Sequence, residues 1–267
     1  MSGRVELLMA PLRSMRRAIF WWSVGLAGLV AATLAFWPAF RGSSGVSDAI
    51  DQLPQGVIQA FGLENFGTPA GYLRGNLYEL FVPLLLAAAA VALASGQTAS
   101  EETAGRLELY LAQPVDRRAL FLGRALAAAI ALLLITVAAT IVQLGLDALV
   151  DLQIGTGLLL STIALSALLA ALHGSLALAI AGLRARPSMV LGVGIGVAIA
   201  GYFVAALFPL IGALEAWRHL SPWDWAFGGD PLETPTELWR YAALGIPALG
   251  LTAIGAVAFD RRDIAAG

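Results

Sequence analysis

The stretch TGLLLSTIALSALLAALHGSLALAIAGL, residues 156–183, contains no Asp, Glu, Lys or Arg. A helix needs about 20 predominantly apolar residues to cross the hydrocarbon core of a bilayer, and this stretch is longer than that. Five further stretches are comparably apolar, so spans are expected at about residues 18–40, 77–95, 120–144, 156–183, 189–210 and 241–259. The sequence therefore predicts an all-α membrane protein with six transmembrane helices, forming one domain over residues 1–267.

Composition supports the membrane class and excludes several kinds of chemistry. The chain is 59% hydrophobic and only 13% charged, whereas soluble domains carry about 25% charged residues. It has no Cys and only two His, which excludes disulfides and thiolate sites and leaves little for a His-based metal site. It also has no Lys, and a Walker A phosphate loop or a Schiff-base enzyme needs one. We therefore expect no enzyme activity, no cofactor on this chain and no nucleic-acid partner.

The placement of charges predicts the orientation. With the N-terminus inside, the inner segments hold twelve of the sixteen Arg but only seven of the eighteen acids. Cytoplasmic loops of membrane proteins carry an excess of basic residues, so both termini are expected in the cytoplasm. All seven Trp, among them Trp37 and Trp223, fall near the predicted ends of spans, which is typical of an aromatic belt.

The first residues predict an interfacial helix. Within Arg4–Arg17, apolar residues recur at helical spacing among four Arg, and such a helix lies in the headgroup plane. It is either an elbow leading into span one or a simple positively charged anchor. The apolar run that follows exceeds the 7–15 residues of a signal peptide, so a retained first span is expected.

The segment between spans one and two, residues 42–74, predicts one or two short amphipathic helices interrupted at Pro54. It is interpreted as an external lid or as a packed connector. Pro83 predicts a kink in span two. Gly192 and Gly196 are four residues apart within an apolar span, which favours close helix packing rather than a nucleotide loop.

The connection between spans two and three carries the strongest functional signal. Thr98 with Glu101 three residues later forms a capping-box pattern, and Pro114 would end the helix that it starts. An amphipathic helix of three to four turns is therefore expected here, on the cytoplasmic side. Gly105 inside it would cost about 1 kcal/mol relative to Ala, and close approach of another surface is one reason to accept that cost.

The run EETAGRLELYLAQPVDR, residues 101–117, resembles the signature of ABC-2 type permeases. Arg106 stands where Thr is usual in that signature, and Asp116 stands where Ser is usual. The outer segment around residues 53–73 and the ending Phe259–Ile264 are also similar to those of bacterial ABC-2 exporters.

This resemblance implies that the connection is a coupling helix docked into a separate cytoplasmic ATPase subunit, which would bind ATP and Mg. It also implies a second permease subunit, identical or related, in the cytoplasmic membrane of a bacterium, and export of drugs or other amphiphiles. The alternative interpretation is a solvated interfacial helix. The implied contact residues are Glu101, Glu102, Gly105, Arg106, Leu107, Glu108, Leu111, Pro114 and Arg117.

Polar residues within the spans are few. Gln143, Ser166 and His173 are candidates to line a transport pathway, since ionisable or polar groups in a span are often functional. For His173, a hydrogen bond to a neighbouring helix is the expected role. An ion-driven secondary transporter would need a carboxylate near the midplane, and no Asp or Glu lies deep in a predicted span. An intramembrane enzyme lacks clustered catalytic groups. A non-transporting assembly or sensor subunit remains an open alternative.

Overall fold

The computed structural model describes residues 2–41, 44–61, 63, 65–105, 116–183 and 186–262. Within these residues every regular element is a helix, and six segments are long and apolar enough to cross a membrane. The prediction of an all-α protein with six spans is confirmed. The spans consist of α1 (Ser2–Phe40), α5 (Phe81–Gln97) with its flanking turns, α8 (Arg117–Val150), α9 (Thr156–Gly182), α10 (Pro187–Leu207) and α12 (Leu238–Arg261).

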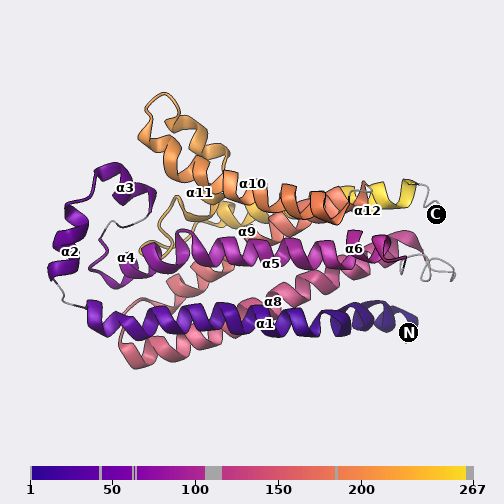
Figure 1. The fold of residues 1–267 in the computed structure, drawn as a ribbon, viewed down its shortest axis with the longest axis horizontal. Helices are drawn as coiled ribbons and strands as arrows, with labels where there is room; N and C mark the ends of the chain where they lie inside the picture. The colour runs from indigo at the N-terminus through magenta and orange to yellow at the C-terminus, as the bar shows by residue number, and fades with distance from the viewer. Residues whose placement is uncertain are drawn as a thin grey trace.

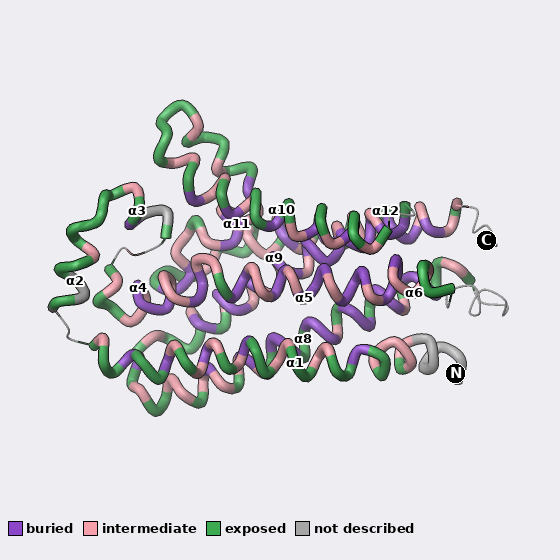
Figure 2. The backbone as a smooth tube through the Cα atoms, viewed as in Figure 1, coloured by how far each residue is buried: buried purple, intermediate pink, exposed green. Residues whose placement is uncertain are grey.

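The helices form one bundle with α5 and α9 at its centre. Helix α9 packs against α5, α12, α8 and α10, while α1 packs mainly along α8. Buried residues concentrate on α5 and α9, whereas α1 and α10 each keep an exposed face (Figure 2). The start of α1 and the end of α12 lie at one end of the bundle, here called the termini end, together with α6 (Ala99–Thr103) (Figure 1).

The opposite end, here called the far end, carries the short helices. The segment after α1 forms α2 (Ser44–Asp51) and α3 (Gln55–Ala60), with Pro54 between them, so the predicted pair of short helices is confirmed. Helix α4 (Pro69–Leu73) begins at Thr68, whose hydroxyl accepts a hydrogen bond from the amide of Gly71 at 3.1 Å. Between α10 and α12 lie η2 (Phe208–Leu210), η3 (Glu215–Leu220) and α11 (Pro222–Phe227).

Span two is irregular where a kink was expected. A π-helical turn, η1 (Arg74–Tyr78), precedes α5, and Leu80 leaves helical geometry with φ −135° and ψ −56°. Pro83 has no amide hydrogen, and its ring clashes with the carbonyl of the residue four positions earlier, which here is Glu79. The helix is therefore irregular about one turn before Pro83, where the proline removes a hydrogen bond and crowds the backbone.

Two sequence-based expectations about local structure need correction. The helix expected at Arg4–Arg17 is not separate, because α1 runs without a break from Ser2 to Phe40. Trp37 and Trp223 are buried inside the bundle rather than placed in a belt, and their rings contact Tyr72 at 5.1 Å and His173 at 5.6 Å. The direction of each side chain depends on tertiary packing, which the position of the residue along the sequence does not reveal.

Close helix packing is achieved by other glycines than those expected. For Gly192 and Gly196, no atom of the described part of the chain lies within contact range of an added Cβ. A Cβ on Gly255 of α12 would lie 2.9 Å from the carbonyl oxygen of Leu178 on α9, and Gly182 of α9 faces the backbone of Gly255 in return. Small residues at a helix interface in a membrane let the two backbones approach closely. The contact between α9 and α12 depends on this glycine pair.

We expect Gly255→Ala to destabilise the protein, because the added methyl group meets backbone atoms that cannot rotate away. Overpacking of this kind costs about 1–3 kcal/mol, and should lower the thermal unfolding temperature in detergent. Gly250→Ala on the same helix is the matched control, because nothing lies within contact range of its Cβ. Equal unfolding temperatures for the two variants would contradict the proposed role of the glycine pair.

Candidate functional site

The connection between α6 and α8 starts differently from its sequence-based prediction. The hydroxyl of Thr98 donates to the carbonyl of Ala94 at 2.6 Å and caps nothing on α6, so the predicted capping box does not form. Helix α6 ends at Thr103, and Gly105 adopts a positive φ of 71°. This left-handed conformation suits glycine and strains other residues. Gly105 therefore ends a short helix instead of lying inside a long one.

Glu102 on α6 pairs with the end of α12. Its carboxylate accepts a hydrogen bond from the guanidinium of Arg262 at 2.5 Å. The same guanidinium lies 4.8 Å from the ring centre of Phe259 and donates to the carbonyl of Ala181, at the end of α9, at 3.4 Å. Both charged side chains are largely buried. Arg262 therefore joins α6, α9 and α12 at the termini end.

Glu101 lies beside a cation of α8. The guanidinium of Arg124 is 4.0 Å from its carboxylate and donates to the carbonyl of Gln97 at 2.5 Å. Arg124 is only 4% exposed. A buried charge whose partner is removed costs about 3–5 kcal/mol, so this arginine fixes α8 firmly against the junction of α5 and α6. The amide of Gln97 in turn donates to Ser14 of α1 at 3.1 Å.

The connection has two roots, which are the residues where it leaves α6 and where it enters α8. The second root, at the start of α8, is also attached to the end of α12. Arg117 donates to the carbonyl of Arg262 at 3.0 Å, and Arg118 donates to the carboxylate of Asp260 at 2.8 Å. Asp116 caps α8 by accepting a hydrogen bond from the amide of Arg118 at 2.9 Å. Both roots of the connection therefore meet at the C-terminal end of α12. We call these residues the loop-root cluster: Gln97, Glu101, Glu102, Arg117, Arg118, Arg124, Asp260 and Arg262.

The cluster contains only some of the residues that the sequence singled out. Glu101, Glu102 and Arg117 belong to it, and Gly105 lies two residues after the end of α6. The carboxylates of Glu101 and Glu102 were expected to face a partner protein, but they face Arg124 and Arg262 of their own chain. The remaining predicted contact residues lie outside the described residues: Arg106, Leu107, Glu108, Leu111 and Pro114.

Arg124, Arg262 and Asp260 were not recognised as site residues from the sequence. They entered the sequence analysis only as charges that set the orientation. A signal was present for Arg124, because an arginine one to two turns inside an apolar span requires an anionic partner or carbonyl groups. Nothing local in the sequence indicates that Arg262 would return to α6.

The three candidate pathway residues lie inside the bundle. Gln143 accepts a hydrogen bond from the hydroxyl of Tyr78 at 2.9 Å, and Ser166 donates to the carbonyl of Thr162 at 2.8 Å. His173 bonds through Nδ1 to the carbonyl of Leu169 on its own helix at 2.8 Å, and the expected hydrogen bond to a neighbouring helix stays a prediction for the other ring nitrogen. Gln143 borders a small internal space between α1, α5 and α8. A pathway role for these residues remains a prediction.

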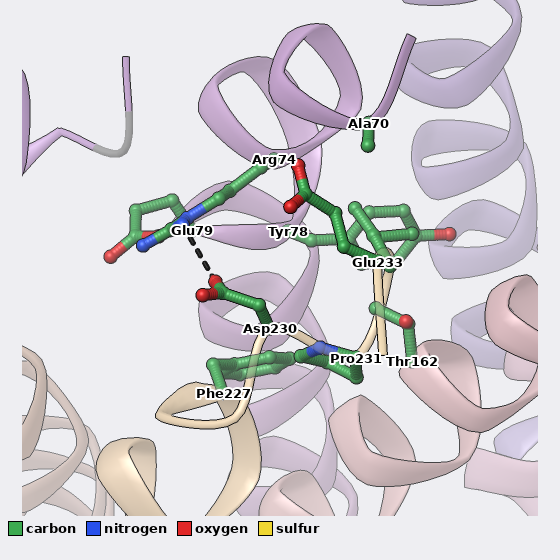
Figure 3. Close-up of a pocket in the computed structure, with 10 residues that line it drawn as sticks. Ala70, Arg74, Tyr78, Glu79, Thr162, Phe227, Asp230, Pro231 and Glu233 are labelled. Atoms are coloured by element: carbon green, nitrogen blue, oxygen red, sulfur yellow. Dashed lines mark hydrogen bonds and ion pairs between the residues drawn. The ribbon is translucent and has the colours of Figure 1, made fainter. Parts of the chain in front are cut away.

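The far end carries a second polar site, between span two and the segment before α12. Arg74 donates to Asp230 at 2.6 Å and to Glu79 at 3.1 Å, and Figure 3 shows these side chains around a pocket that Tyr78, Thr162 and Glu233 also line. A neighbouring polar cavity of about 360 Å³ shares Arg74, Glu79 and Asp230. Arg74 lies at the start of the π-helical turn, a feature often found at functional positions. Among the described residues, no three His, Asp or Glu are grouped closely enough to hold a metal ion.

The chain matches a known protein family over most of its length. The family described as the C-terminal domain of the multidrug efflux system permease Rv1217c matches residues 8–260. A search of curated proteins found no match. The matched range includes α5, α6, α8 and nearly all of α12, and therefore most of the loop-root cluster.

We expect Glu102→Arg to destabilise the protein, because it replaces an ion pair with two adjacent cations. Hydrogen bonds to charged groups contribute about 1.5–3 kcal/mol, and the unfolding temperature in detergent should fall accordingly. The double variant Glu102→Arg/Arg262→Glu restores opposite charges and should recover much of the loss. Failure of the exchange to recover any stability, with both proteins folded, would argue that the pair itself contributes little.

Proposed function

Because the chain belongs to the multidrug efflux permease family that matches residues 8–260, we propose that it is the membrane subunit of an ATP-driven exporter of the ABC-2 type. A separate ATPase chain binds and hydrolyses ATP with Mg, and docks on the connection between α6 and α8. The exported compounds are drugs or other amphiphilic molecules.

The observation that carries this proposal is the loop-root cluster. Both roots of the connection are bound to the end of α12, and one root is also bound to α8 and α9 through Arg124 and Arg262. A displacement of the connection by a docked protein would therefore be passed to three spans at once, α8, α9 and α12. A solvated loop would not need to be attached to each of these helices by buried charges, which cost free energy to desolvate.

The contacts with the ATPase are assigned to the middle of the connection. Glu101 and Glu102 have partners in their own chain, so their part in coupling is to hold the loop roots in place. Direct docking falls to Arg106, Leu107, Glu108 and Leu111, with Gly105, Pro114 and Arg117 at the borders of the docking segment. The lack of Lys in the chain supports an ATP site on the partner, because the phosphate loop of such ATPases needs one.

The termini end is assigned to the cytoplasm. It carries most of the arginines, as expected for the inner face of a membrane protein. Arg13, Arg16 and Arg17 are exposed on α1 at this end, followed by exposed Phe20 and Trp21. In this orientation the loop-root cluster meets a cytoplasmic ATPase, and the pocket around Arg74 opens on the outer side of the bacterial cytoplasmic membrane.

A second permease subunit, identical or related, is assigned to the outer face of α10. This helix leaves large apolar side chains exposed, among them Val193, Val197 and Phe203. Gly192 and Gly196 lie on the same helix with open space above them. Two glycines four residues apart are typical of the surface through which transmembrane helices associate.

Purification of the complex tests the ATPase partner. In mild detergent, an ATPase chain should co-purify with this protein, and its ATP hydrolysis should depend on the presence of this chain. Glu108→Arg in the connection should reduce the recovered ATPase several-fold, because it changes the charge of the docking surface. Asp48→Arg, an exposed charge reversal at the far end, is the matched control. Recovery of the permease without any ATPase would overturn the proposal.

The second-subunit interface is tested by Gly196→Leu. The larger side chain should prevent close approach of two α10 helices and shift the protein towards monomers, as measured by light scattering or native mass spectrometry in detergent. Gly28→Leu on the exposed face of α1 is the control, since it too has nothing within contact range of its Cβ. If the two variants show the same oligomeric state as the unchanged chain, the interface lies elsewhere.

A further inference from the structure

A cavity of about 470 Å³ lies between α8 and α12, with α5 and α9 behind it. Its inner wall combines small residues, including Ala90, Ala171 and Gly174, with Leu168 and Leu178. Exposed leucines border it, Leu122 and Leu126 on α8 and Leu249 on α12. The cavity therefore opens sideways from the bundle, on a surface that faces the bilayer in a membrane protein with these six spans.

The sequence creates this space by combining a firm contact with small side chains. At the termini end, α8 and α12 are held together by Phe121 and Phe259, whose ring centres are 5.4 Å apart, and by the pair of Arg118 and Asp260. The cavity begins directly beyond this contact. There, Ala125, Ala128 and Ala129 on α8 face Ala248 and Thr252 on α12 across a gap that their side chains are too short to fill.

The polarity of the cavity restricts what it can bind. Among the residues that the structure describes, no charged one lines the cavity, and its polar side chains are Ser175 of α9 and Thr252 of α12. The hydroxyl of Thr252 lies 3.1 Å from the hydroxyl oxygen of Ser175 and also donates to the carbonyl of Ala248 at 2.9 Å. Each hydroxyl oxygen has two lone pairs, so the pair can accept a hydrogen bond from a bound molecule. A charged ligand would be desolvated here without a counter-charge, at a cost of several kcal/mol.

We propose that this cavity binds an uncharged, mainly apolar compound that carries a hydroxyl or N–H group and enters from the bilayer between α8 and α12. The Ser175–Thr252 pair accepts the hydrogen bond from that group, and the alanine wall packs against the apolar body. The volume is that of sites for drug-sized ligands, which are about 300–1,000 Å³. A lipid acyl chain has no donor for the hydroxyl pair. The inference rests on the proposed exporter function, for which it names a substrate class and a site.

The absence of Cys from the chain allows a direct binding test on the full-length protein in lipid nanodiscs. One thiol is introduced by Ala129→Cys in the cavity, or by Leu133→Cys, which is exposed on α8 outside the cavity. Each is labelled with bimane, and energy transfer from 9-anthracenemethanol, an uncharged donor of a hydrogen bond, is titrated. We expect saturable transfer to the label at residue 129 and only a linear rise, from partition into lipid, at residue 133.

The hydroxyl pair is tested in the same assay. Thr252→Val should weaken binding of 9-anthracenemethanol about 3- to 10-fold, the loss expected for one hydrogen bond, and Thr252→Ser should restore it. Binding of 9-methylanthracene, which has no donor, should be unaffected by either variant. This comparison separates recognition by the hydroxyls from a general loss of structure, because a loss of structure would weaken the binding of both compounds.

Three results would overturn the inference. Linear transfer at both labelled positions would mean that the compound only dissolves in lipid. Disulfide formation between two copies carrying Ala129→Cys would mean that a second subunit covers the cavity. Equal affinity for the two anthracenes would mean that the hydroxyl groups of Ser175 and Thr252 do not contribute to binding. The assay contains no ATPase, so failure to bind is distinguishable from failure of the exporter proposal, which is decided by co-purification.

Discussion

The contact between Arg262 and Glu102 closes the termini end of the bundle. Through its guanidinium, its carbonyl and its stacking on Phe259, Arg262 contacts residues of α6, α8, α9 and α12. The contact forms where the helices leave the apolar part of the bundle. Breaking it would leave two largely desolvated charges without a counter-charge, which costs free energy. Without it, α6 would lose its ion pair with the end of α12, and the start of α8 would stay attached there through Arg117 and Arg118.

The positions of the spans along the chain could be predicted from the sequence, because each depends only on the hydrophobicity of its own residues. Each span is a long apolar run, and the bilayer fixes the length required. The break between α2 and α3 at Pro54 and the irregularity before Pro83 were also predictable, because proline acts on its own backbone. Local rules failed where two interactions compete. Thr98 has the sequence of an N-cap, but its hydroxyl bonds to the preceding turn of α5 instead.

The candidate site was only half predictable for a related reason. Glu101 and Glu102 were recognised as important from the pattern around them, but a pattern within one segment says nothing about partners more than a hundred residues away. Arg262 lies 160 positions after Glu102. The same limit explains the glycines: spacing identified Gly192 and Gly196 as packing residues, while Gly182 and Gly255 make the close contact within the chain. Which helix lies beside which is decided by the whole bundle.

The two ends of the bundle differ in a way that bears on transport. At the termini end, Phe121 and Arg118 hold α8 against α12, and Leu122, the residue after Phe121, lines the apolar cavity. At the far end, Arg74 ties span two to the segment before α12 through Asp230. The cavity lies between these two sets of contacts. There, α8 and α12 face each other with alanines, which are too small to pack across the gap. A shift of Arg117 and Arg118, the first residues of α8, relative to the end of α12 would change the separation of the two helices at the mouth of the cavity. Since Arg117 also borders the connection, the connection and one wall of the cavity belong to the same helix, α8.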